Sequence, residues 1–192
     1  MSKALYLVGA ILLALTIAGA ARADKAPPPI SFGGPFSLID HDGEPRTERS
    51  FDGKYLLIYF GYTFCPAICP TGLQAMAEAV DGLGDAGAKV QPLFVTIDPA
   101  RDTPAALKEY VGHFHPRMIG LTGSEPDIAR TARSFRVHRR KVVLADAEGP
   151  EDYLVDHGSM TYLMAPDGSW LTLFPHNTDP EKMTAAIRRY LQ

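Results

Sequence analysis

This chain has few cysteines, a single tryptophan and no net positive charge. Two cysteines and one tryptophan occur among 192 residues, too few thiols for a fold stapled by disulfides. Residues 1–23 contain Lys3 and Arg22 but no acidic residue, so 17 basic and 22 acidic side chains remain in residues 24–192, a net charge of −5. That balance argues against a nucleic-acid partner. The length suits one domain with a full core.

A long uncharged run occurs only near the N-terminus. Residues 4–21 follow Lys3, are mostly apolar, and would span about 27 Å as a helix, close to the roughly 30 Å of a hydrocarbon core. The sequence Ala-Arg-Ala at 21–23 is typical of a signal cleavage site. We therefore predict a signal peptide or N-terminal membrane anchor over residues 1–23, with the anchor slightly favoured. Either one places the rest of the chain outside the cytoplasm, on the periplasmic side.

Strand and helix patterns alternate after a proline- and glycine-rich segment, residues 24–35, which reads as a linker. The predicted order over residues 36–192 is β-β-α-β-α-β-α-β-β-β-α. A helix over 71–86 connects buried strands 55–60 and 90–97, and a right-handed crossover makes these two strands parallel neighbours. The predicted fold is therefore α/β, one domain of layered sheet and helices. Further strands are predicted at 36–39, 141–145, 161–165 and 170–174, and further helices begin near 104, 125 and 180.

Both cysteines lie in one corner between a predicted strand and a predicted helix. The segment GYTFCPAICPTGL, residues 61–73, contains Cys65 and Cys69. Pro70 suits the first position of the following helix, where a missing N–H costs nothing. This assignment puts Cys69 at the N-cap and Cys65 in the loop before it. A helix N-terminus stabilises negative charge, so reactive thiolates are expected at this corner.

Three segments are predicted to meet at the rim where this corner lies. Sites in open α/β sheets form beyond the carboxyl ends of parallel strands, and Asp98 follows the end of strand 90–97. His157 precedes strand 161–165, whose start reaches the same edge if that strand runs antiparallel to its neighbours. Two thiols, a carboxylate and an imidazole are therefore expected close together.

The residues alone leave more than one chemistry open at this rim. A structural disulfide is disfavoured, because three intervening residues close a loop too small to restrict the unfolded chain much. The spacing C-x-x-x-C also differs from the C-x-x-C of thioredoxin-like oxidoreductases. Two thiolates with one imidazole suit copper, whereas structural zinc normally takes four protein ligands. Copper binding is therefore the favoured hypothesis, and redox activity of the thiols and a catalytic zinc site are the alternatives.

Three motifs together resemble the Sco/SenC family of copper proteins. They are GYTFCPAICPT at 61–71, VTIDPARDTP at 95–104 and VDHGS at 155–159, in the family's order and spacing, within a resemblance that covers about residues 33–192. Ala67 and Gly158 depart from the residues that many members carry, and neither departure removes a metal ligand.

The resemblance implies a thioredoxin-like fold with a central mixed sheet flanked by helices. It implies that Cys65, Cys69 and His157 are copper ligands and that Asp98 supports copper binding or transfer. It further implies a metallochaperone that carries Cu(I), Cu(II) or both during assembly of the copper centres of cytochrome c oxidase. Its partners would be a copper-accepting oxidase subunit, an upstream copper donor, and the membrane if the N-terminal segment is retained.

An alternative function uses the same two thiols without a metal. In an extracytoplasmic thiol-disulfide reductase, Cys65 and Cys69 would cycle to keep the acceptor's cysteines reduced, and His157 would be dispensable. Met160 is close enough in sequence to reach the rim, but we expect it in the core. The basic run 130–141 is expected to be a solvated surface, with a docking patch for an acidic partner as the alternative.

Overall fold

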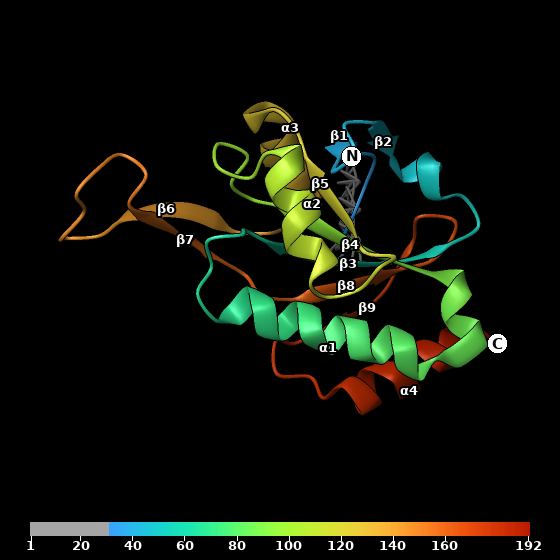
Figure 1. Ribbon diagram of the computed structural model, residues 1–192. Coiled ribbons are helices and arrows are strands. Elements are labelled where there is room, and N and C mark those ends of the chain that lie inside the picture. The colour runs from blue at the N-terminus through green and yellow to red at the C-terminus, as the bar shows by residue number, and fades with distance from the viewer. Residues whose placement is uncertain (1–30) are drawn as a thin grey trace, which may run out of the picture. The chain divides into compact units, whose positions relative to one another are not determined.

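The computed structural model describes residues 31–192 and contains a seven-stranded sheet, a separate hairpin and four α-helices (Figure 1). The strands are β1 (Ser37–Asp40), β2 (Pro45–Thr47), β3 (Tyr55–Gly61), β4 (Val90–Thr96), β5 (Ile119–Thr122), β6 (Arg139–Val143), β7 (Tyr153–His157), β8 (Thr161–Met164) and β9 (Trp170–Phe174). The α-helices are α1 (Ile68–Gly82), α2 (Pro104–Gly112), α3 (Glu125–Ser134) and α4 (Pro180–Tyr190), with 3₁₀ turns η1 (Glu48–Phe51) and η2 (Gly84–Lys89).

The sheet has the strand order β2-β1-β5-β4-β3-β8-β9. Strand β3 runs parallel to β4, and β4 runs parallel to β5, while the other pairs are antiparallel. The predicted α/β fold with a mixed central sheet is confirmed, as is the parallel pairing of the two buried strands around α1. Six of the seven residues of β3 are buried, because helices cover both faces of the sheet.

Alternate residues of the central strands show which helices cover which face. Tyr59 of β3 contacts α1, and Phe94 of β4 packs against Tyr110 of α2, with ring centroids 5.4 Å apart. Phe60 points to the opposite face, where its ring lies 5.1 Å from that of Phe135, at the end of α3. Helices α1 and α2 therefore share one face with α4, which packs along α1, and α3 lies behind the sheet (Figure 1).

One helix and one strand differ from their predicted bounds by two or more residues, and two strands were not predicted. The helix expected at 71–86 is α1, Ile68–Gly82, because Gly84 takes a positive φ of 62° and the chain continues as the 3₁₀ turn η2. The strand expected at 141–145 lies two residues earlier, as β6. Strand β2 has only three residues, and β7 alternates too briefly between buried and exposed side chains to be recognised from its pattern.

Part of the expected linker lies against the domain. The ring of Phe32 packs against Tyr162 and Trp170, with centroids 5.8 and 5.0 Å away. The predicted signal or anchor and residues 24–30 lie outside the described residues. Within residues 31–192, no helix has the length and apolar character needed to span a bilayer.

The start of α1 approaches β3 at a glycine. A Cβ at Gly72 would lie 2.7 Å from the ring of Tyr59, and the Tyr59 side chain is fully buried. The ring has no open side toward which it could move, because interiors are close-packed. Gly72 thereby sets how closely the cysteine-bearing end of α1 sits on the sheet.

We expect Gly72→Ala to lower the free energy of unfolding by about 1–3 kcal/mol, the usual cost of overpacking a core. Gly112→Ala is the matched control, because a Cβ at Gly112 meets nothing within 4 Å. The control should gain about 0.4–1 kcal/mol from reduced chain entropy in the unfolded state. Urea unfolding measures both, and equal stability changes in the two variants would contradict the close approach.

Candidate metal centre

Three of the predicted site residues come together at one rim of the sheet. The potential ligand atoms of Cys65, Cys69 and His157 all lie within 4.8 Å of one another. Both cysteines are free and buried, and His157 is half-buried. Cys69 and His157, which are 88 positions apart in the chain, thus belong to one compact group of two sulfurs and an imidazole.

The cysteine side of the group is built by the first turn of α1. This helix begins at Ile68 with Ala67 as its N-cap, so the prediction of Cys69 at the N-cap is wrong, and Cys69 is the second residue of the helix. The alanine offers no side-chain acceptor to the free N–H groups of the first turn. Instead, the Cys69 N–H donates to the Sγ atom of Cys65, at 3.4 Å.

The two thiols respond to this arrangement in opposite directions. The pKa of Cys65 falls to about 3, first because the Cys69 thiol donates to it, and further because it accepts from the backbone N–H groups of Cys69 and Ala67. The pKa of Cys69 rises, because its proton is held by Cys65 and because the site is buried. The metal-free protein therefore has one thiolate and one thiol, and not the two thiolates that we expected from the helix dipole.

His157 is the last residue of β7, and its ring presents Nε2 to the sulfurs. Nε2 lies 3.7 Å from the Cys69 Sγ, and Nδ1 lies 2.9 Å from the Gly158 carbonyl oxygen. A carbonyl can only accept, so Nδ1 carries the proton and the lone pair of Nε2 faces the thiols. The ring of Tyr62 packs edge-on against the imidazole, with centroids 5.9 Å apart.

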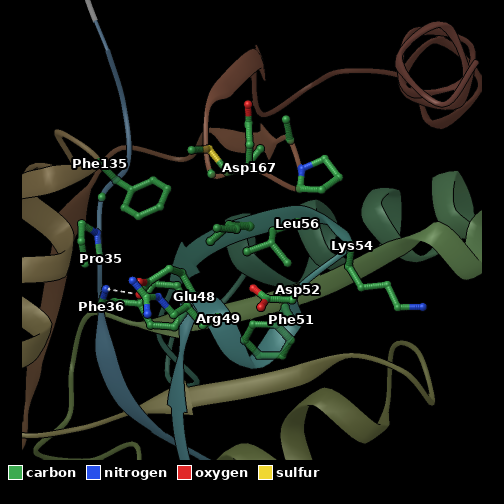
Figure 2. A pocket seen from close by; sticks show the side chains of 16 residues that line it. Pro35, Phe36, Glu48, Arg49, Phe51, Asp52, Lys54, Leu56, Phe135 and Asp167 are labelled. Carbon is green, nitrogen blue, oxygen red and sulfur yellow. Dashed lines mark hydrogen bonds between the residues drawn. The ribbon is translucent and has the colours of Figure 1, made fainter.

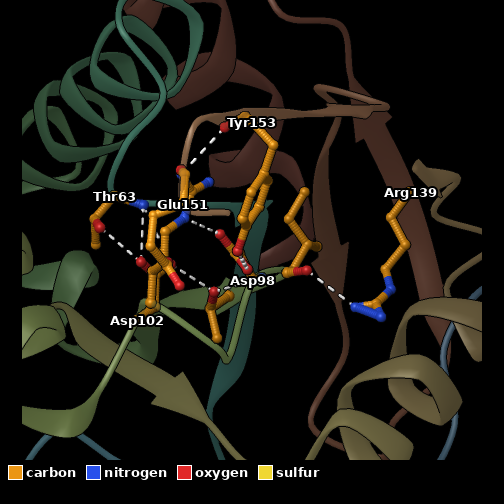
Figure 3. Close-up of polar contacts among 9 residues, drawn as sticks. Thr63, Asp98, Asp102, Arg139, Glu151 and Tyr153 are labelled. Carbon is orange, nitrogen blue, oxygen red and sulfur yellow. Dashed lines mark hydrogen bonds and ion pairs between the residues drawn. The ribbon is translucent and has the colours of Figure 1, made fainter. Parts of the chain in front are cut away.

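Asp98 belongs to a cluster of polar contacts of its own (Figure 3). Its side chain is fully buried, accepts from Arg101 Nε at 2.6 Å and accepts from the Tyr153 hydroxyl at 2.8 Å. Asp98 is not part of the group of potential ligand atoms. Asp98 is thus bonded to the residue that begins β7, the strand that ends at His157.

Asp102 is a buried residue of the same region that the sequence reading missed. Its carboxylate accepts from the hydroxyls of Thr63 and Thr96, at 2.6 Å each, and from the Thr63 N–H (Figure 3). Burial raises the pKa of Asp102. In the sequence, Asp102 directly precedes Thr103-Pro104, where a helix begins. An acidic residue is common at a helix start, so the sequence gave no sign that Asp102 has a second role.

Exposed apolar side chains surround the group. Phe64 precedes Cys65 and is 59% exposed, Ile68 precedes Cys69 and is 45% exposed, and Met160 is 40% exposed. Our expectation of Met160 in the core is therefore wrong, because β8 enters the core only from Thr161 onward. Large exposed apolar side chains next to a reactive centre are typical of a surface that meets another molecule.

A separate hollow of about 390 Å³ lies elsewhere in the domain (Figure 2). It is lined by Leu56 and Ile58, at the beginning of β3, and by the turn between β8 and β9, so it lies at the opposite end of β3 from Cys65. Its walls mix apolar side chains with charged ones of both signs, including Glu48 and Lys54. None of the three clustered donor residues lines it.

The donor set fits copper on chemical grounds. Thiolates select Cu(I), imidazole accepts copper in either oxidation state, and both sulfurs are free to bind. Within residues 31–192, no fourth His, Cys, Asp or Glu side chain joins the group, which does not suit a structural zinc site. The mixed sheet and this rim together define a thioredoxin-like protein with a site of two thiols and an imidazole.

Comparison with known proteins identifies the family. The family described as SCO1/SenC matches residues 24–192. The mitochondrial SCO1 homolog 1 of Arabidopsis thaliana is 43% identical over 158 residues, which cover 82% of this chain and 46% of that protein. This chain therefore belongs to the SCO1/SenC family, and it spans about half to three fifths of the length of several relatives that it matches.

Solved structures agree in fold. The copper-bound ScoI of Arabidopsis thaliana superposes with a TM-score of 0.76 at 42% identity, over 83% of this chain and 97% of that one. The copper-bound ScoI of Bradyrhizobium japonicum gives 0.75 at 41% identity, over 83% and 99%. These neighbours confirm the predicted thioredoxin-like fold.

We expect Cys69→Ala to raise the pKa of Cys65 toward that of an ordinary thiol, because the largest cause of its lowering is the hydrogen bond from the Cys69 thiol. The thiolate fraction of reduced, metal-free protein, followed by ultraviolet absorbance against pH, measures this change. Cys65→Ala is the control and should abolish the low-pH titration. An unchanged titration in Cys69→Ala would contradict the assignment.

Proposed function

We propose that this protein is a copper chaperone that holds copper through Cys65, Cys69 and His157. The observation that carries the proposal is the convergence of these three donors within 4.8 Å at one rim. The thiolate at Cys65 is prepared for a soft metal, and the proton on Nδ1 of His157 leaves Nε2 available. Membership of the SCO1/SenC family supports a role in assembling the copper centres of cytochrome c oxidase.

Either oxidation state of copper is compatible with these donors. Two sulfurs favour Cu(I), and adding an imidazole nitrogen makes the set suitable for Cu(II) as well. The buried sulfurs and the half-buried ring limit contact with water. We therefore propose that His157 contributes more to holding Cu(II) than to holding Cu(I).

The rim location supports transfer to a protein partner. Phe64, Ile68 and Met160 are exposed around the donors, so an incoming apolar surface can reach the group. A cysteine of a copper-accepting oxidase subunit would replace one ligand at a time, and an upstream copper donor would load the site by the reverse exchange. Asp98 supports the site from the neighbouring cluster.

The protein acts outside the cytoplasm in this proposal, on the periplasmic side. The support is the N-terminal sequence, where Lys3 and the apolar residues 4–21 predict export or anchoring in the inner membrane. A thioredoxin-like domain over residues 36–192 would then hold copper near the membrane, after a linker over residues 24–35.

A thiol-disulfide reductase is the second candidate, favoured by the thiolate of Cys65 beside the protonated Cys69. The Cys65 sulfur would attack a partner disulfide and form a mixed disulfide, releasing one partner thiolate. The Cys69 thiol would pass its proton to the released partner thiolate, and its sulfur would then displace the second partner thiolate and close a Cys65–Cys69 disulfide. The partner gains two electrons and this protein loses two.

A copper titration of the reduced protein with a competing chelator tests the first proposal. We expect one tightly held copper per chain, and an affinity for Cu(II) that falls by more than about 10-fold in His157→Ala, because removing a ligand should exceed the loss seen for outer partners. His138→Ala is the matched control, since that side chain is 68% exposed, and it should bind as the wild type does.

Two results would overturn the copper proposal. The first is the absence of tight copper binding to the wild type, and the second is equal affinity in wild type and His157→Ala. Reduction of a disulfide-bonded peptide by His157→Ala at the wild-type rate, combined with either result, would favour the reductase.

A further inference from the structure

We propose that Arg101 positions His157, acting with Asp98 and Tyr153 as a clamp on the β6–β7 hairpin. The proposal rests on the proposed function, because it assigns the clamp to the histidine side of the copper site. It gives Asp98 a specific role, that of a structural partner of Arg101 and Tyr153.

The hairpin that bears His157 needs such a clamp. Strands β6 and β7 form a two-stranded sheet of their own, separate from the seven-stranded sheet. The hairpin extends away from the sheet in Figure 1. A two-stranded hairpin is marginally stable by itself, so the place of its last residue, His157, depends on contacts that side chains make with the domain.

Arg101 makes several of these contacts. Its side chain is only 6% exposed, and its Nε donates to Asp98 at 2.6 Å. Its Nη1 donates to the carbonyl oxygens of Glu151 and Tyr153, at 2.9 and 3.1 Å. The centre of its guanidinium lies 3.7 Å from the centroid of the Tyr153 ring. The planar guanidinium thus contacts both the backbone and the ring of Tyr153, the residue that begins β7. It also binds Asp98, the carboxylate that accepts from the Tyr153 hydroxyl.

Two further bonds attach the hairpin to the end of β4 (Figure 3). The Tyr153 hydroxyl donates to Asp98 at 2.8 Å. Arg139, which pairs with His157 across the hairpin, donates from Nη1 to the Ile97 carbonyl oxygen at 3.0 Å. The start of β7 is therefore bonded directly to residues 97–101, and its end is bonded to them through Arg139 of β6, which also pairs with Glu125 of α3.

The same segment also holds the cysteine side of the site. The guanidinium of Arg101 lies 4.5 Å from the centroid of the Phe64 ring, next to Cys65, and Asp102 binds the backbone and hydroxyl of Thr63. Residues 98–102 therefore contact both parts of the site, and the Arg101 side chain reaches both. This geometry sets the separation of the imidazole from the sulfurs.

A double-mutant cycle for Cu(II) affinity tests the clamp. Tyr153→Phe removes one hydroxyl and keeps the ring, so the fold should persist. We expect it to weaken Cu(II) binding by about 10-fold, the scale for partners that orient a ligand. In the His157→Ala background the same change should have no effect, because the clamp acts only through that histidine. Tyr55→Phe is the matched control, since its hydroxyl donates to the Tyr190 carbonyl far from the site.

Arg101→Lys is the second variant, which keeps the charge but cannot form the same fork of bonds. It should weaken binding at least as much as Tyr153→Phe, again only when His157 is present. A readout without copper accompanies the cycle. Amide hydrogen exchange should accelerate in β7 in both variants and stay unchanged in β3, whereas general destabilisation would accelerate both.

The outcomes separate the two proposals. If wild type binds copper and His157→Ala weakens it, but Tyr153→Phe and Arg101→Lys bind like wild type, the clamp is wrong and the copper site stands. If each change weakens binding equally with and without His157, the clamp acts on the fold in general, and the proposal is also wrong. If wild type holds no copper, both proposals fail.

Discussion

The parallel pairing of β3 with β4 is the constraint on which the site depends. The two strands pair over seven residues, from Tyr55 with Val90 to Gly61 with Thr96, so the chain leaves both strands at the same level. The loop that carries Cys65 and the turn that carries Asp98 must therefore lie side by side. The long apolar runs that make these strands central also place polar and reactive residues at their ends.

The third donor reaches this place by a different route. His157 belongs to a hairpin outside the main sheet, and buried charged and aromatic groups fix its position where no strand pairing does. Breaking a buried pair such as Arg101 with Asp98 leaves an uncompensated charge, which costs several kcal/mol. The sheet thus positions the cysteine part of the site through strand pairing. Side-chain contacts attach the histidine part to the sheet, and these contacts are fewer than the hydrogen bonds of the paired strands.

Sequence alone predicts the parts of this arrangement that local patterns encode. The buried runs of β3 and β4, the helix between them and the meeting of Cys65, Cys69 and His157 all follow from periodicity and topology. The clamp could not be predicted, because Arg101 and Tyr153 stand 52 residues apart and nothing local marks the pair. The unequal pKa values of the thiols also escaped prediction, since they depend on which sulfur accepts the hydrogen bond from the other thiol and on a helix start two residues earlier than Pro70 suggested.

The hydrogen bond from His157 Nδ1 to the Gly158 carbonyl determines which substitutions the site can tolerate at position 158. Its acceptor is a main-chain oxygen, which every residue type supplies, so no point substitution at 158 deletes it. A Cβ added there meets nothing within 4 Å, and the backbone has no positive φ that would demand glycine. The residue at position 158 therefore does not affect which imidazole nitrogen is protonated, because the backbone carbonyl determines it.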